Sequence, residues 1–566
     1  EDQRVREAMR DLLRKTGMPS ATAKAMSSWD PYDQNTSASF FDSDWMFGLK
    51  SDDKQTATLL GNLSLINEVS GQTELIESPP KESSGRFDVV IGNPPFIRIQ
   101  TLKKKDPKLV AFYKEEYDSA AKGNYDLYVV FIEAGLRLLK SDGHLAFICP
   151  HKFFNAQYGE PLRELISEGK HLKQVVHFGD EQVFSGATIY TCLLFLSKTA
   201  TPDCRFIKAH NLAEWRESRA GIAGKIPARD ITSTEWNFAV GNGADLVGAL
   251  RDSYKHLGEL ADAFVGLQTS ADDVFILDLV EARQKTLLVR SKTLQKAVEL
   301  ERELLHPIVS GTDVKQFAPL PDRQHILFPY AVKNERAFLI PFNELEAKHK
   351  LTAEYLKDNQ QKLKSREKGK FNDSEWHRFG RSQNLGIQDR PKLCVPRLVD
   401  HLHAGIDLEG THYLDNVDVG GVTWKPAFSE RSLRTLLALF NSQILRWYFP
   451  HVSAPFRGGF RSANRQFIDQ LPICDFDAQQ SLSVDHLVDY LLFINKQDNG
   501  HPADQSTRDP LMLAYFEQIL NGLVYELYFP EEVHGAGLQL FDVVAKAKLP
   551  AIETIPEEDR LPRLRT

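Results

Sequence analysis

An apolar stretch that stops at two consecutive prolines, Phe87 to Phe96 (FDVVIGNPPF), constrains this chain more than any other segment. Four apolar residues among its first five positions predict a central strand of a parallel sheet, covered on both faces. Two prolines cannot continue strand pairing, so they fix the backbone at the carboxyl edge of the sheet. Open α/β sheets place their ligands at this edge. The pattern therefore predicts that Asn93 and Phe96 are presented together at an active site.

The residues after this strand, Asn93, Pro94, Pro95 and Phe96, suit methyl transfer to an exocyclic amine of a nucleobase. The Asn93 side-chain oxygen and the Pro94 carbonyl are acceptors for the two amine hydrogens, and Pro95 stiffens the turn. Phe96 is placed to stack on the base, which must leave the duplex to be reached. The alternative is a strand followed by a tight Pro-Pro turn that Asn93 merely closes.

The surroundings of this motif resemble adenine-N6 DNA methyltransferases, specifically the large enzymes fused to restriction or anti-phage defence systems. The segments that carry the resemblance are Trp29 to Asn35, Phe40 to Gly48, Gly123 to Tyr128 and Gly143 to Pro150. The family usually has tyrosine as the fourth motif residue, and Phe96 keeps the ring while losing the hydroxyl. The resemblance implies a site-specific enzyme that transfers a methyl group from S-adenosylmethionine to N6 of a flipped adenine.

Alternating strands and helices follow the motif. We expect a helix over 127–138, a break at Gly143, and strands over 144–149, 173–178 and 189–196. This rhythm predicts an α/β fold with a doubly wound, Rossmann-like methyltransferase sheet, which we expect to be incomplete on its N-terminal side.

Two further parts of the active site are implied by the resemblance. Phe184 is expected to stack on the opposite face of the flipped base, although from the residues alone it reads as the anchor of a hairpin core. The donor normally sits at a Gly-rich strand-to-helix turn, which residues 1–86 do not contain. We therefore expect a fragment whose donor half lies upstream, with Asp42 and Asp88 as the candidate carboxylates for cofactor binding.

The second half of the chain resembles the carboxyl-terminal target-recognition domain of the same family. The supporting segments are His306 to Val314, Ile326 to Tyr330, Pro391 to Arg397, Asn441 to Ser442 and Gln470 to Ile473. We expect a catalytic domain over 1–200, a polar connector over 201–254, an α+β target-recognition domain over 255–480, and a helical extension over 481–566.

Local charge indicates contact with double-stranded DNA, although the whole chain has a net charge of -8. Between Lys362 and Arg397 there are ten basic residues against four acidic ones, and such a patch binds phosphates through counterion release. The candidate DNA contacts are Lys103, Lys104, Lys105, Arg378, Arg381, Arg397, Arg457, Arg461 and Arg465. For each of them the alternative is a solvated surface charge.

Composition narrows the remaining possibilities. The five scattered cysteines lack paired spacing, so we expect neither a metal site nor disulfides. We therefore expect a cytoplasmic location. No apolar run approaches the roughly 20 residues that a membrane helix needs. Two other functions stay open: a bifunctional restriction endonuclease-methyltransferase with a fused or separate nuclease, and a DNA-binding specificity module without catalysis. Cytosine N4 also remains open as the target, because the same acceptor geometry suits both amines.

Overall fold

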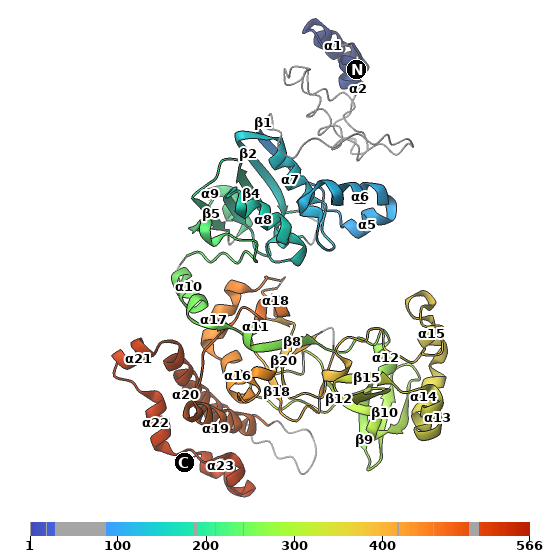
Figure 1. Cartoon of the computed structure of the whole chain (residues 1–566), viewed down its shortest axis with the longest axis vertical. Coiled ribbons are helices and arrows are strands. Elements are labelled where there is room, and N and C mark those ends of the chain that lie inside the picture. Colours follow the sequence, from blue (N-terminus) through green and yellow to red (C-terminus); the bar gives the residue numbers. More distant parts are fainter. Residues whose placement is uncertain are drawn as a thin grey trace. The chain divides into compact units, whose positions relative to one another are not determined.

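The computed structural model describes residues 2–18, 20–28, 87–184, 189–209, 211–241, 243–415, 418–456, 458–496 and 509–565. The chain divides into two compact units, Glu1–Val240 and Gly241–Thr566, and each is treated separately below (Figure 1). None of the helices in the described part of the chain is both long and apolar enough to cross a membrane.

A six-stranded mixed sheet forms the centre of the first unit. Its order is β1 (Phe87–Gly92), β2 (Leu139–Pro150), β4 (Thr191–Ser197), β3 (Leu172–His177), β5 (Asp203–Lys208) and β6 (Ile222–Pro227). The pairs β1–β2 and β3–β5 are parallel and the other neighbours are antiparallel. The α/β methyltransferase-like fold class is thus confirmed, with a mixed sheet rather than a parallel one.

Helices cover both faces of this sheet. The helices of the unit are α1 (Asp2–Lys15), α2 (Ser20–Ser28), α5 (Ile99–Lys105), α6 (Pro107–Glu116), α7 (Tyr128–Leu138), α8 (Glu160–Glu168) and α9 (Leu212–Ser218). The main core packs α7 and α8 against one face, and a smaller cluster around Trp215 of α9 covers the other. A Cβ atom at Gly135 would lie 2.5 Å from Leu145, so this glycine lets α7 approach the sheet closely.

Two features of the first unit differ from the sequence expectation. Within the described residues β1 pairs only with β2, and Val89 and Ile91 are 60% and 80% exposed, so β1 is an edge strand covered on one face. The apolar residues of β1 are suited to burial on both faces of a sheet. Their sequence does not identify which strands lie beside β1. The expected connector also supplies β5 and β6 to this sheet, because the alternating residues Cys204 and Phe206 point into its core.

The second unit contains two larger sheets. The first is six-stranded, in the order β11 (Lys296–Glu301), β10 (Thr286–Ser291), β9 (Ile276–Ala282), β13 (Gln324–Leu327), β12 (Leu305–Val309) and β19 (Tyr413–Leu414). The other is four-stranded, in the order β18 (Gly405–Asp407), β16 (Lys392–Pro396), β20 (Val419–Trp424) and β8 (Ala261–Val265). Two-stranded pairs complete it: β7 (Lys255–His256) with β22 (Pro472–Ile473), β14 (Tyr330–Lys333) with β15 (Arg336–Leu339), and β17 (Leu398–Val399) with β21 (Arg461–Ser462).

Helices lie before and between the strands of the second unit and also form the end of the described chain. They are α10 (Ala244–Ser253), α11 (Leu257–Leu260), α12 (Asp272–Phe275), α13 (Phe342–Lys348), α14 (Lys350–Asp358), α15 (Gln360–Gly369), α16 (Leu433–Phe440), α17 (Gln443–Val452), α18 (Arg465–Ile468), α19 (Ala478–Ile494), α20 (Pro510–Tyr528), α21 (Pro530–Gly535), α22 (Leu540–Ala547) and α23 (Glu557–Arg565). Helix α19 packs against both α16 and α20, so the carboxyl-terminal helices belong to this unit (Figure 1).

Candidate functional site

The expected base-binding residues come together at the carboxyl end of β1. Asn93 follows Gly92, the last residue of that strand. The Phe96 ring lies 6.5 Å from the Phe184 ring with a tilt of 57°, and 6.5 Å from Tyr128 in an edge-on contact. Two aromatic rings from segments far apart in the sequence are therefore in tilted contact, and one of them, Phe96, follows Asn93 by three residues.

The separation of these two rings is that of two aromatic side chains in tilted contact, which can be compared with what a nucleobase would require. A flat base between two rings needs two contact distances, or roughly 7 Å in all. The observed separation of 6.5 Å falls just short of this, and the 57° tilt means that one ring must turn for both to stack on one base. The expected stacking of both rings on one base would therefore need a rotation and an outward movement of Phe96 or Phe184.

Backbone hydrogen bonds hold the loop that carries Phe96. The Leu127 amide donates to the Ile97 carbonyl at 2.8 Å, and the Ile99 amide donates to the Tyr125 carbonyl at 3.0 Å. These bonds attach the segment after the prolines to the start of α7. The backbone next to Phe96 is thereby held in place. The segment after the prolines and the segment Gly123 to Tyr128, which both resemble the family, lie side by side.

A buried phenol pair supports the edge contact of Phe96. The Tyr128 hydroxyl lies 3.0 Å from the Tyr158 hydroxyl, and Tyr158 donates to Asp126 at 3.4 Å. Burial raises the pKa of both phenols above their ordinary value, so both remain protonated at neutral pH. The pair therefore acts as a neutral hydrogen-bonded support rather than as a source of charge.

Two histidines pack against one another, with their rings tilted, where β2 and β3 end. The ring centroids of His151 and His177 are 4.0 Å apart, and the Gly179 amide donates to His177 Nδ1 at 3.0 Å. Burial lowers the pKa of His151 to about 4 and that of His177 well below its ordinary value. Both rings are therefore neutral in the folded protein at pH 7.

Acid should destabilise the first unit through His151. In the unfolded chain this residue takes up a proton near pH 6.5, whereas in the fold it does so only near pH 4. The unfolded state then binds more protons between these values, so stability is lost as the pH falls through that window, by about 3 kcal/mol from this group. Thermal unfolding at pH 7.5 and 5 should show a smaller loss for His151→Asn than for the parent. The exposed His144→Asn variant should match the parent, and equal losses for all three proteins would refute the assignment.

The proposed DNA-contacting arginines of the second unit are already engaged with the chain. Their partners are Asp373 for Arg378, Glu367 for Arg381, Asn464 for Arg397, the Pro450 and Ser453 carbonyls for Arg461, and Asp469 for Arg465. Arg457 lies outside the described residues. The side chains of Arg381 and Arg465 are nevertheless half or more exposed. In the first unit, Lys103, Lys104 and Lys105 are exposed in the last turn of α5 and form no ion pair with the described residues.

A polar pocket of about 360 Å³ gathers two of these arginines. It opens beside β20, β16 and β8, and its polar side chains are Gln383, Asn384, Arg397, Asn464, Arg465 and Gln466. Amide and guanidinium groups are those that proteins use most on base edges. Sequence reasoning missed the two glutamines and the two asparagines, because no charge pattern distinguishes them before folding brings them together.

Of the two carboxylates considered for the donor, Asp88 does not lie beside Asn93. Asp88 lies near the start of β1, opposite the end that carries the motif, and Lys140 pairs with it at 2.8 Å. The hydrogen bond from Lys140 lowers the pKa of this exposed carboxyl. Asp42 lies outside the described residues. The described part of the first unit thus contains no recognisable Gly-rich turn for a donor.

Comparisons with known proteins match two separate parts of the chain to two different domains. Residues 23–184 match the model of the Eco57I restriction-modification methylase, and residues 306–473 match the TaqI-like C-terminal specificity domain. The type II restriction enzyme and methyltransferase RM.Eco57I of Escherichia coli is 28% identical over 69% of this chain and 41% of its own length. The type II methyltransferase M.PaeR7I of Pseudomonas aeruginosa is 26% identical over 69% of this chain and 65% of its own length.

The chain therefore spans less than two thirds of the length of either relative.

Among solved structures, the type IIL restriction-modification enzyme MmeI in complex with DNA aligns over 78% of this chain and 54% of its own, with 15% identity and a TM-score of 0.48. Both matched regions lie within single units of the structure, one around the Asn93 motif and one across the two larger sheets of the second unit.

Proposed function

We propose that this chain, whose residues 23–184 match the Eco57I restriction-modification methylase and whose residues 306–473 match the TaqI-like C-terminal specificity domain, methylates adenine N6 in double-stranded DNA. The observation that carries the proposal is the placement of Asn93 at the end of β1, three residues before Phe96, whose ring is in tilted contact with that of Phe184. The second unit would select the sequence at which the base is presented.

The residues Asn93 and Pro94 act on the amine that receives the methyl group. The N6 lone pair of adenine is delocalised into the ring, which makes it a weak nucleophile. Hydrogen bonds from the amine to the Asn93 side-chain oxygen and the Pro94 carbonyl favour a pyramidal nitrogen whose lone pair is available. As the new N–C bond forms, the C–S bond of the sulfonium donor would break and release a neutral thioether, so that the nitrogen gains a positive charge that the two acceptors stabilise. The amine then loses one proton to solvent.

The methyl donor proposed from the family is S-adenosylmethionine, which supplies an electrophilic methyl group on a sulfonium. The described residues do not show the Gly-rich turn that such a donor uses, so the residues assigned here concern the acceptor base alone. This assignment is tested by incubating the protein with radiolabelled donor and DNA and digesting the product to nucleosides. We expect the label in N6-methyladenine; label in N4-methylcytosine would overturn the choice of base.

Substitutions at Phe96 should separate stacking from the chemical step. Phe96→Tyr keeps the ring and should retain activity, whereas Phe96→Ala loses a stacking partner that is worth roughly 1–3 kcal/mol, or about 10- to 100-fold in the stability of the extruded base. Fluorescence of 2-aminopurine at the target position measures extrusion without methyl transfer. Equal extrusion by the alanine and tyrosine variants would contradict the stacking role.

A second candidate function follows from the relative RM.Eco57I, which is named as both a restriction enzyme and a methyltransferase. The chain would then be the methylating and DNA-selecting part of a polypeptide that also cleaves DNA. Incubation of the natural full-length polypeptide with unmethylated DNA and Mg²⁺ decides between the two, because cleavage at sites that methylation protects requires a nuclease.

A further inference from the structure

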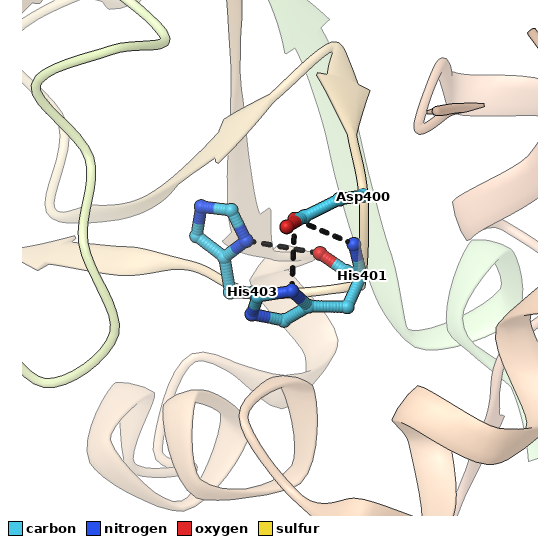
Figure 2. Close-up of side chains that lie close together, drawn as sticks. All are labelled: Asp400, His401 and His403. Atoms are coloured by element: carbon cyan, nitrogen blue, oxygen red, sulfur yellow. Dashed lines mark hydrogen bonds and ion pairs between the residues drawn. The ribbon is translucent and has the colours of Figure 1, made fainter. Parts of the chain in front are cut away.

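Two histidines and an aspartate meet in the loop between β17 and β18 of the second unit (Figure 2). Asp400, His401 and His403 each offer one ligand atom, and these atoms all lie within 4.8 Å of one another. The rings of the two histidines are 5.1 Å apart. Within the described residues, no other three histidine, cysteine, aspartate or glutamate side chains gather in this way.

The backbone that carries this cluster is held firmly by its neighbours. Val399, Leu402 and Ala404, which flank and separate the polar residues of the loop, are buried. The buried side chain of Asn441 accepts a hydrogen bond from the Ala404 amide at 2.9 Å and donates one to the Ala404 carbonyl at 3.2 Å. The three polar side chains are therefore presented together by a fixed loop rather than by a mobile one.

Hydrogen bonds leave lone pairs on the side chains of His403 and Asp400. His403 Nδ1 donates to the His401 carbonyl at 2.9 Å, which leaves Nε2 of that ring as an unprotonated ligand atom. Asp400 Oδ1 accepts from the His401 amide and lies 2.8 Å from His401 Nδ1, as Figure 2 shows. The other carboxylate oxygen, Oδ2, has no hydrogen-bond partner among the described residues.

We propose that Asp400, His401 and His403 form a binding site for a divalent transition-metal ion, with Zn²⁺ the best match. Two imidazoles and one carboxylate are a donor set that binds zinc with one coordination position open, whereas Mg²⁺ and Ca²⁺ require mainly oxygen. Ligand atoms around a tetrahedral zinc lie about 3.4 Å apart. The present separations of up to 4.8 Å can close by side-chain rotation alone, because the loop backbone is already in place.

The cysteine side chains of this chain do not offer a competing ligand for such an ion. All five cysteines are buried, so no thiolate at the surface takes part. The expectation that the chain holds no metal site came from these cysteines and did not consider the Asp-His-x-His pattern. The site lies beside the β17–β21 pair, so a bound metal ion would link the side chains of the loop that follows Arg397. Because the ion would bind only the folded state, it would raise the thermal stability of the second unit.

Zinc binding by the full chain tests this proposal, measured by competition with a chromophoric chelator in the presence of excess Mg²⁺. We expect one equivalent to bind, and the His401→Ala/His403→Ala variant to bind it at least about tenfold more weakly. The matched control is His144→Ala, which removes an exposed histidine of the first unit and should bind as the parent does. The parent should also gain a few degrees in melting temperature with zinc, and the double variant should not.

A thiol replacement keeps the test decisive if the double variant folds poorly. His403→Cys retains a zinc ligand, so it should bind one equivalent and should give a sulfur-to-metal charge-transfer band with Co²⁺. Zinc affinity that is the same in the parent, the double variant and His144→Ala would overturn the proposal. So would a His403→Cys protein that binds Co²⁺ without the charge-transfer band.

Discussion

Replacement of Asn93 by alanine is expected to lower methyl transfer to DNA at least about 100-fold while leaving the affinity for DNA nearly unchanged. In the proposed mechanism the side-chain oxygen would contact the amine only when the base is in the site, and it would stabilise the charge that appears as the methyl group arrives. DNA affinity comes instead from phosphate and groove contacts spread over a larger surface. The measurement is methyl transfer under single-turnover conditions, together with DNA binding by fluorescence anisotropy.

Two variants sharpen this test. Asn93→Gln keeps the amide and moves its oxygen by one methylene, so it should also be strongly impaired if position matters. Gln479→Ala removes an exposed amide from α19 of the second unit and should leave the rate unchanged. An Asn93→Ala protein that transfers methyl groups at the parent rate would contradict the assignment of this loop.

Removal of Lys392 is expected to cost about 3–5 kcal/mol in the free energy of unfolding of the second unit. Its ammonium group is fully buried between β16 and β18, where it donates to Asp407 at 2.7 Å and to the Gln388 carbonyl at 2.7 Å. Burial alone would raise the pKa of Asp407, but hydrogen bonds from His412 and Lys392 hold it well below its usual range. Lys392→Ala therefore leaves a buried carboxylate without its partner, and denaturant unfolding measures the loss.

A paired replacement separates the broken contact from the buried charge. Lys392→Met combined with Asp407→Leu removes both charges and should lose less stability than Lys392→Ala alone. The exposed pair of Lys348 and Glu344 on α13 serves as the control, and Lys348→Ala should leave stability nearly unchanged. Equal effects of Lys348→Ala and Lys392→Ala would contradict the role given to the buried pair.

Much of the first unit could be predicted because its elements have strong periodicity. The helix expected over 127–138 is α7 at Tyr128–Leu138, and the strand expected over 144–149 lies within β2 at Leu139–Pro150. The proximity of Phe184 to Phe96 also agrees with the family resemblance, although no apolar pattern joins the two residues. A resemblance can transfer such a long-range contact, whereas local periodicity describes only one element at a time.

Other features depend on contacts between residues, which a pattern within one short segment does not reveal. The charge excess between Lys362 and Arg397 does not reveal that Arg378 is bound by Asp373, or that Arg381 is bound by Glu367. Likewise, the segment that contains β5 looks polar because alternate side chains face solvent, although its other residues complete the sheet. The Asp400 cluster was missed because its geometry depends on Asn441, which lies far along the chain.

The most direct measurement of the central claim is a map of methylated bases in the DNA of a host that lacks its own adenine methylation. Single-molecule sequencing of cells that produce the protein should detect N6-methyladenine within one recurring sequence, and cells that produce the Asn93→Ala variant at an equal level should lack it. Methylated cytosine in place of adenine, or the same adenine pattern with the Asn93→Ala variant, would contradict the account.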